Sequence, residues 1–243
     1  MSKKTITFLC VMLFSLSQEF QLCKAERLND IFSQWKAGEK VSEKDVVIFG
    51  KENCFVSEEI SDSIFRIMKG KSFKKNCTIP RSDLRYIKVL HKNLQGETML
   101  GEMVCNKAIA SDLLVIFQKL YDASYPIERM VLIDSYNADD ISSMEANNSS
   151  SFNFRFVSGT NKLSKHSEGM AVDINPLYNP YVKKRADGTV VVSPESATPH
   201  VNRKKSFQYK ICRNDLCVKL FKQHGFSWGG DWKSLKDYQH FEK

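Results

Sequence analysis

The stretches 164-SKHSEGMAVDINP-176 and 227-SWGGDWKSLKDYQHFE-242 decide how the rest of the chain is interpreted. Each contains one histidine and one aspartate that stand out, His166 with Asp173 and Asp237 with His240, and each contains glycine. His166 and Asp173 flank Gly169 at a spacing that is not helical, which favours a loop, a turn at the glycine and a strand that carries Asp173. Asp237 precedes His240 by three residues, a separation that one turn can place on one side.

These residue types point to metal-assisted hydrolysis. Catalytic zinc usually takes three protein ligands from His, Asp or Glu and keeps a fourth position for water. The metal makes that water nucleophilic near neutral pH, and a neighbouring carboxylate passes its proton to the leaving amine. This chemistry predicts His166, Asp173 and His240 as zinc ligands and Asp237 as the general base. A single His or Asp is more often a solvated or hydrogen-bonded surface residue, so spacing alone leaves both interpretations open.

The order of the motifs carries a family resemblance. S-x-H-x-x-G-x-A-x-D, followed by W-G-G-x-W and D-x-x-H-F, resembles the zinc D-alanyl-D-alanine carboxypeptidases and L-alanyl-D-glutamate endopeptidases, which include the vancomycin-resistance D,D-peptidases. The resemblance runs from about residue 84 to the C-terminus. It implies the same ligands and base, Zn²⁺ as cofactor and a peptidoglycan stem peptide as substrate. We also expect Ser164, Trp228 and Gly229 to contact the substrate.

One role of that family is harder to place on this sequence. Its enzymes generally use an arginine upstream of the first zinc ligand to stabilise the oxyanion or hold substrate, often in a motif like G-Y-R-S. The corresponding place here reads Ser135-Tyr136-Asn137, which lacks the arginine. Arg155, eleven residues before His166, is the natural replacement, and the alternative is that it forms a structural ion pair.

The sequence divides into three predicted segments. Residues 1–25 have the basic start, apolar run and terminal alanine of a secretory signal peptide. Residues 26–82 are predicted to be a helical N-terminal extension, and residues 83–243 the zinc peptidase domain. Within that domain, residues 109–120 form the clearest amphipathic helix and residues 130–133 a predicted strand. The resemblance implies an α+β fold of the hedgehog/D,D-peptidase type, a small antiparallel sheet with helices packed on one side.

Composition and charge support an exported globular protein. The chain has 243 residues, of which 42% are apolar and 26% charged, and a formal net charge of +8. The positive charge suits an anionic partner such as a cell wall, whereas no aromatic–basic motif indicates nucleic acid. We therefore expect a secreted or periplasmic protein with no stable membrane span after signal cleavage. Export permits disulfides, and the candidate pairs are Cys54 with Cys77 and Cys212 with Cys217, leaving Cys105 buried.

The sequence thus predicts a secreted zinc metallopeptidase that cleaves a stem-peptide amide bond, of either the D,D-carboxypeptidase or the L-Ala–D-Glu endopeptidase type. Two alternatives remain open. The chain could be a catalytically inactive, zinc-stabilised module that binds the cell wall, although such a module has no need of the base Asp237. It could also be a secreted zinc hydrolase for a substrate outside the wall.

Overall fold

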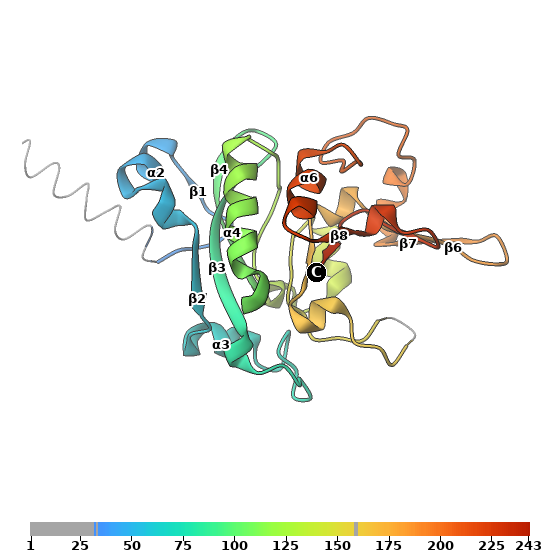
Figure 1. Cartoon of the computed structure of the whole chain (residues 1–243), viewed down its shortest axis with the longest axis horizontal. Coiled ribbons are helices and arrows are strands. Elements are labelled where there is room, and N and C mark those ends of the chain that lie inside the picture. The colour runs from blue at the N-terminus through green and yellow to red at the C-terminus, as the bar shows by residue number, and fades with distance from the viewer. Residues whose placement is uncertain (1–31, 33, 158–159) are drawn as a thin grey trace, which may run out of the picture.

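The computed structural model describes residues 32, 34–157 and 160–243, and the predicted signal peptide at residues 1–25 lies outside them. These described residues form three small antiparallel sheets with helices around them (Figure 1). The helices in this part of the chain are α2 (Glu43–Phe49), α3 (Asp62–Met68), α4 (Lys107–Asp122), α5 (Asp140–Glu145) and α6 (Leu216–Gln223). The strands are β1 (Lys40–Val41), β2 (Val56–Glu59), β3 (Leu84–Lys92), β4 (Thr98–Asn106), β5 (Ala171–Asp173), β6 (Tyr181–Lys184), β7 (Val190–Ser193), β8 (Ser227–Trp228), β9 (Lys236–Asp237) and β10 (His240–Glu242).

The first sheet is built on the long hairpin β3–β4. Its two nine-residue strands pair in register from Leu84 with Asn106 to Lys92 with Thr98. β1 and β2 add to its edges, giving the order β1-β4-β3-β2. The described part of the segment before residue 82 therefore contributes β1 and β2 to this sheet in addition to the helices α2 and α3.

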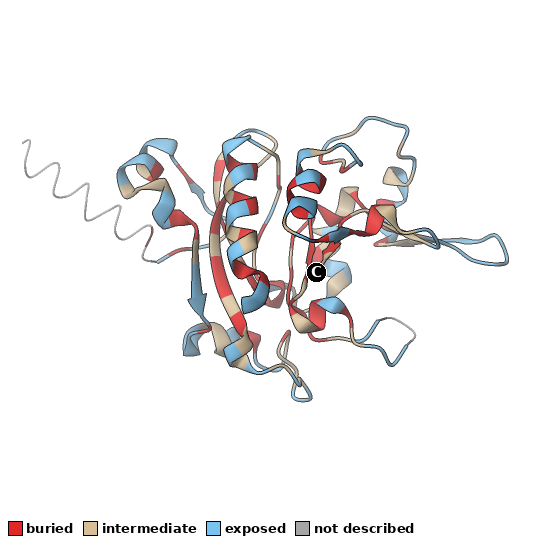
Figure 2. Cartoon of the chain, viewed as in Figure 1, coloured by how far each residue is buried: buried red, intermediate tan, exposed pale blue. Residues whose placement is uncertain are grey.

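Helix α4 covers one face of the hairpin and starts directly after it. The side chain of Asn106 caps the helix by accepting a hydrogen bond from the backbone N–H of Ala108 at 3.0 Å, which satisfies one of its free N-terminal donors. An apolar stripe then recurs at helical spacing and is almost fully buried, as the red face of the helix shows in Figure 2: Ile109, Leu113, Ile116, Phe117 and Leu120. Each such side chain stabilises the fold by roughly 1.5–3 kcal/mol.

Helix α4 also contacts the half of the molecule that carries the two later sheets. Phe117 of α4 meets Phe221 of α6 edge to face, with ring centroids 6.5 Å apart. Phe221 in turn stacks on Phe241 of β10 at 4.2 Å. One continuous hydrophobic core therefore links the hairpin, α4, α6 and β10. The two later sheets have the strand orders β5-β10-β8 and β7-β6-β9.

The predicted α+β fold class with small antiparallel sheets and packed helices is confirmed. The strand expected at residues 130–133 is not present. That segment instead leads into the 3₁₀ helix Ile133–Tyr136, while Asn148 bonds both the N–H and the carbonyl of Val131 through its side chain. A side-chain amide thus takes the place of a strand neighbour, a contact that apolar patterning cannot reveal.

The predicted disulfides are not formed in the structure. The five cysteines that it describes are all free, namely Cys54, Cys77, Cys105, Cys212 and Cys217. Cys54 belongs to the main core, whereas Cys77 packs against a second cluster around Met68 and Tyr86, so the two point into different cores. Cys217 is buried on α6, whereas Cys212 is exposed in the preceding loop. Neither candidate pair is therefore joined by a disulfide.

Candidate active site and metal centre

His166 lies on a short 3₁₀ turn, Lys165–Glu168, that is fixed at both ends. The hydroxyl of Ser164 caps the turn by accepting from the N–H of His166 at 3.3 Å. Gly169 ends it with φ of 66°, a left-handed conformation that favours glycine. A Cβ atom at Gly169 would also lie 2.7 Å from the backbone nitrogen of Asn106, so the turn sits directly against the end of β4.

Asp173 and His240 come from neighbouring strands. β5 and β10 pair antiparallel, and in their register His240 lies directly opposite Asp173. Side chains alternate along a strand, so Phe241 points away from the site and into the core. The apolar side of β10 therefore anchors the strand whose polar side carries His240.

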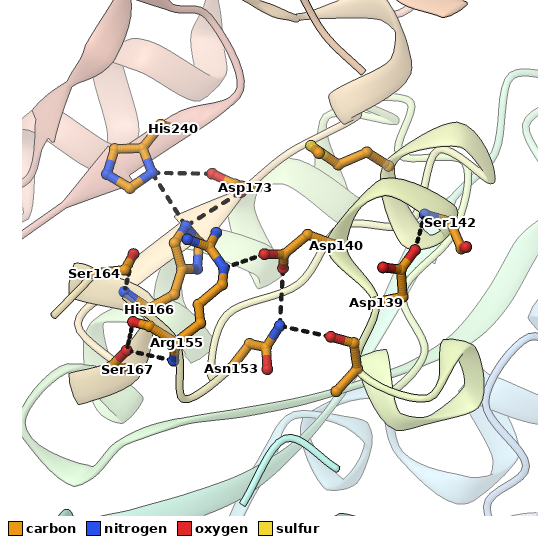
Figure 3. Close-up of polar contacts among 12 residues, drawn as sticks. Asp139, Asp140, Ser142, Asn153, Arg155, Ser164, His166, Ser167, Asp173 and His240 are labelled. Carbon is orange, nitrogen blue, oxygen red and sulfur yellow. Dashed lines mark hydrogen bonds and ion pairs between the residues drawn. The ribbon is translucent and has the colours of Figure 1, made fainter. Parts of the chain in front are cut away.

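These three side chains converge at one point, as Figure 3 shows. His166 Nε2 lies 3.2 Å from His240 Nδ1 and 3.2 Å from Asp173 Oδ2, and His240 Nδ1 lies 3.1 Å from Asp173 Oδ1. All three residues are buried. Tetrahedral zinc with ligand atoms at about 2.0–2.1 Å would hold them roughly 3.3 Å apart. The donor set and its spacing therefore fit a zinc ion.

The second nitrogen of each histidine has its own acceptor. His166 Nδ1 lies 2.7 Å from the carbonyl oxygen of Ser151, so Nδ1 carries the proton and donates it. His240 Nε2 lies 3.1 Å from Glu242 Oε2. Acceptors of this kind behind metal-binding histidines fix the tautomer and the orientation of the ring. They leave His166 Nε2 and His240 Nδ1 facing the common point.

The charged groups within the cluster shift one another's pKa. Burial alone would raise the pKa of Asp173, but His166 and His240 hold it well below its ordinary value. Burial alone would lower the pKa of His240, but hydrogen bonds to Asp173 and Glu242 raise it to about 10. The cluster therefore holds a carboxylate anion together with protons that a bound cation would displace.

Asp237 lies next to this cluster without belonging to it. It sits on β9, opposite Tyr181 of β6. The residue is half-buried, yet its Oδ1 is shielded from solvent and has no hydrogen-bond partner. Burial raises the pKa of Asp237 to about 7, opposed by His240 and reinforced by Asp173. A carboxyl group that exchanges a proton near neutral pH is suited to general-base chemistry.

Arg155 also lies beside the cluster (Figure 3). The segment that carries Arg155 runs alongside the His166 turn. There the backbone N–H of Arg155 donates a hydrogen bond to Ser167 Oγ at 2.8 Å. Its guanidinium forms an ion pair with Asp140 at the start of α5. Asp140 is itself held by Asn153, whose side-chain amide donates to Oδ1 at 2.9 Å. The ion pair considered as the alternative for Arg155 is thus present, and it fixes the guanidinium next to the candidate ligands.

The three residues predicted to contact substrate each make close contacts within the protein itself. Ser164 caps the His166 turn, as described above. Trp228 is 3% exposed and donates its indole N–H to the carbonyl of Tyr238 at 2.9 Å. A Cβ atom at Gly229 would lie 2.5 Å from the carbonyl oxygen of Asp237, so glycine permits close approach of the chain that carries the candidate base. Trp232, the second tryptophan of the motif, lies beside the His240 ring with centroids 5.4 Å apart.

Two acidic residues at the site were not singled out from the sequence. Glu242 follows His240 by two residues, and strand alternation would have placed both on one face of β10. Asp140 is fifteen residues before Arg155 and had no local signal, because the two meet only through the fold of the intervening loop.

The site is thus a buried cluster of two histidines and one aspartate that could hold a metal ion, with a carboxylate and an arginine beside it. Residues 158–243 match the family model described as D-alanyl-D-alanine carboxypeptidase. The match confirms the family recognised from the motifs. It includes every candidate ligand and Asp237, and it begins just after Arg155. No solved structure gave a significant match to the chain.

Proposed function

We propose that this protein is a zinc-dependent peptidase that hydrolyses an amide bond in peptidoglycan stem peptides. The observation that carries the proposal is the convergence of His166, Asp173 and His240 beside the unpartnered carboxylate oxygen of Asp237. The family of the C-terminal segment supports a peptidase that acts on wall peptides. A pure binding module would gain nothing from burying a carboxylate oxygen that has no hydrogen-bond partner, which costs stability.

His166, Asp173 and His240 would hold the zinc ion. When bound in such a site, zinc acts as a Lewis acid that polarises oxygen atoms and makes water more acidic. Asp237 accepts the proton of the attacking water and delivers it to the leaving amine. Arg155 stabilises the negative charge that develops on the substrate carbonyl oxygen, with its guanidinium held in place by Asp140.

We further propose that the protein acts outside the cytoplasm, in a secreted or periplasmic form. The proposal rests on the signal-like composition of residues 1–25 and on the net charge of +8, which favours an anionic wall. Across the residues that the structure describes, none of the helices has the length and apolar character needed to span a membrane.

The test is digestion of purified peptidoglycan by the full chain, with fragments identified by mass, before and after treatment with a chelator. We expect release of D-alanine or of a cut stem peptide, lost on chelation and restored by added zinc. The released fragment names the bond and so separates the carboxypeptidase from the L-Ala–D-Glu endopeptidase. Stoichiometric zinc with intact peptidoglycan would favour the binding module or a different substrate. A wild-type protein that binds no zinc would overturn the proposal.

A further inference from the structure

The two nitrogens of the His240 ring face different groups. Nδ1 faces the cluster, 3.1 Å from Asp173 and 3.2 Å from His166 Nε2. Nε2 faces the other way, toward Glu242 Oε2 at 3.1 Å. A half-turn of the ring would put Cδ2 where Nδ1 now lies and Cε1 where Nε2 now lies. The turned ring would present carbon to the cluster and would also lose the bond to Glu242.

We infer that Glu242 is a positioning residue that holds the His240 ring with Nδ1 toward the metal. This inference rests on the proposed function, since it concerns the geometry of the zinc ligands. Among the groups that contact this ring, the Trp232 indole lies 5.4 Å away and packs against it without distinguishing nitrogen from carbon. Glu242 does distinguish nitrogen from carbon, because its carboxylate accepts a hydrogen bond from a ring N–H and gains none from a ring C–H.

The backbone places the Glu242 carboxylate firmly. Residues 240 and 242 are two apart on β10 and share its face, while Phe241 between them is fully buried. Glu242 pairs with Ala171 of β5 on one side and with Ser227 of β8 on the other. Its side chain is 30% exposed, so it is partly desolvated beside the ring. A charge-assisted hydrogen bond in such a place is stronger than one in open solvent.

His166 offers an internal contrast. Its outward nitrogen donates to the backbone carbonyl of Ser151, an acceptor that no side-chain substitution removes. The orientation of His240 depends instead on a side chain. Substitution of Glu242 should therefore disturb one ligand of the cluster and leave the other two in place.

A nearby carboxylate provides the matched control. Glu168 pairs with Lys165 at 2.9 Å, and both side chains are exposed. Its side chain belongs to the same turn as His166 but has no bond to either histidine ring. E168Q changes the net charge as much as E242Q does, and so it measures the effect of charge alone.

The experiment is competition for zinc between the purified full chain and a chromophoric chelator, with E242A, E242Q and E168Q compared with the wild type. We expect E242A to weaken zinc affinity about 10–100-fold, as loss of an acceptor behind a ligand does. E242Q keeps an acceptor oxygen at the same length and should lose less than about tenfold. E168Q should stay within about twofold of the wild type, as expected for an exposed ion pair.

A second readout is taken on the zinc-loaded protein, first on the wild type and then on the variants. Long-range ¹H–¹⁵N spectra should show His240 bound to the metal through Nδ1, with a slowly exchanging proton on Nε2. That proton should exchange faster in E242A and remain protected in E242Q, a difference that a purely structural role would not produce. Circular dichroism of each variant checks that it is folded.

The outcomes separate the two proposals. If the wild type binds zinc tightly and E242A binds it equally well, the positioning role is overturned and the proposed function stands. Coordination of His240 through Nε2, or an equal loss of affinity in E168Q, would also overturn it. If the wild type binds no zinc, the proposed function fails and the positioning role fails with it.

Discussion

His240 and Asp173 lie directly opposite each other on the paired strands β10 and β5, although 67 residues separate them in the sequence. Their side chains meet at 3.1 Å on the same face of the small sheet. A slip of the register by one residue would turn one of them toward the core and remove it from the site. The pairing of these two short strands therefore creates the candidate metal centre.

Removal of a candidate ligand should abolish zinc binding. We expect D173A and H240A each to lose stoichiometric zinc, because two remaining donors are too few for a stable site, and to lose peptidase activity with it. Metal analysis after dialysis measures the first effect and digestion of peptidoglycan the second. H224A is the control, because His224 lies outside the cluster. Its Nδ1 atom pairs with Asp112 Oδ1 at a distance of 2.9 Å. Full zinc content in H240A would show that the ligand is misassigned.

Substitution of the candidate base should separate zinc binding from activity. We expect D237N to retain zinc and to lower kcat by about 10²–10⁴-fold, because the amide cannot accept a proton. The raised pKa of Asp237, to about 7, also predicts that wild-type activity falls as the pH drops below that value and the carboxylate becomes protonated. A pH–rate profile measures this fall in activity on the acidic side. Wild-type turnover by D237N would mean that another group is the base.

Arg155 and Asp140 should affect catalysis unequally. R155A removes the guanidinium itself, and we expect kcat to fall about 10²–10³-fold with zinc retained, as for loss of an oxyanion donor. D140N leaves the guanidinium but frees it from its ion pair, so its effect should be smaller. R213A is the matched control, since Arg213 is an exposed arginine that likewise forms an ion pair with an aspartate, Asp231. Equal activity of R155A and R213A would show that Arg155 has only a structural role.

Gly169 should be far less tolerant of a side chain than Gly188. Both have positive φ, 66° and 88°, but only Gly169 faces backbone atoms at the Cβ position. We expect G188A to lower the free energy of unfolding by about 1–2 kcal/mol from backbone strain alone. G169A should cost roughly a further 1–3 kcal/mol from the clash with Asn106. Urea unfolding curves measure both, and equal losses would contradict the close packing of this turn against β4.

His91 should make stability fall in mild acid. It is 2% exposed, its Nδ1 lies 2.7 Å from the carbonyl oxygen of Ile127, and its Nε2 has no partner. Burial lowers its pKa to about 4 from an ordinary value of 6.5. Between these values the unfolded chain binds the proton more readily than the folded one. The free energy of unfolding should therefore decrease as the pH falls from 6.5 to 4, by about 1.4 kcal/mol per pH unit at most.

The measurement compares the wild type with H91Q by urea unfolding at pH 7.5 and pH 5, both in chelator so that metal binding does not contribute. Other titrating groups are common to both proteins and cancel in the difference. We expect the wild type to lose about 2 kcal/mol more than H91Q between the two pH values. The same loss in both proteins would show that His91 is not the responsible group.

The sequence by itself predicted the candidate site residues and the family that residues 158–243 match. The residue types and spacings around His166, Asp173, Asp237 and His240 are local properties, and the family motifs are read from them directly. The amphipathic stripe of α4 was equally local, because a period of 3.6 residues is written in the order of the amino acids. The α+β class was implied by the family resemblance.

Only the tertiary structure decided which residues meet. It placed Asp140 on Arg155, set Trp232 rather than Trp228 beside the His240 ring, and added β1 and β2 to the edges of the hairpin sheet. It also left the cysteines unpaired by putting Cys54 and Cys77 in different cores. These contacts join segments far apart in the chain. They depend on strand register and on the packing of one layer against another, which no local pattern encodes.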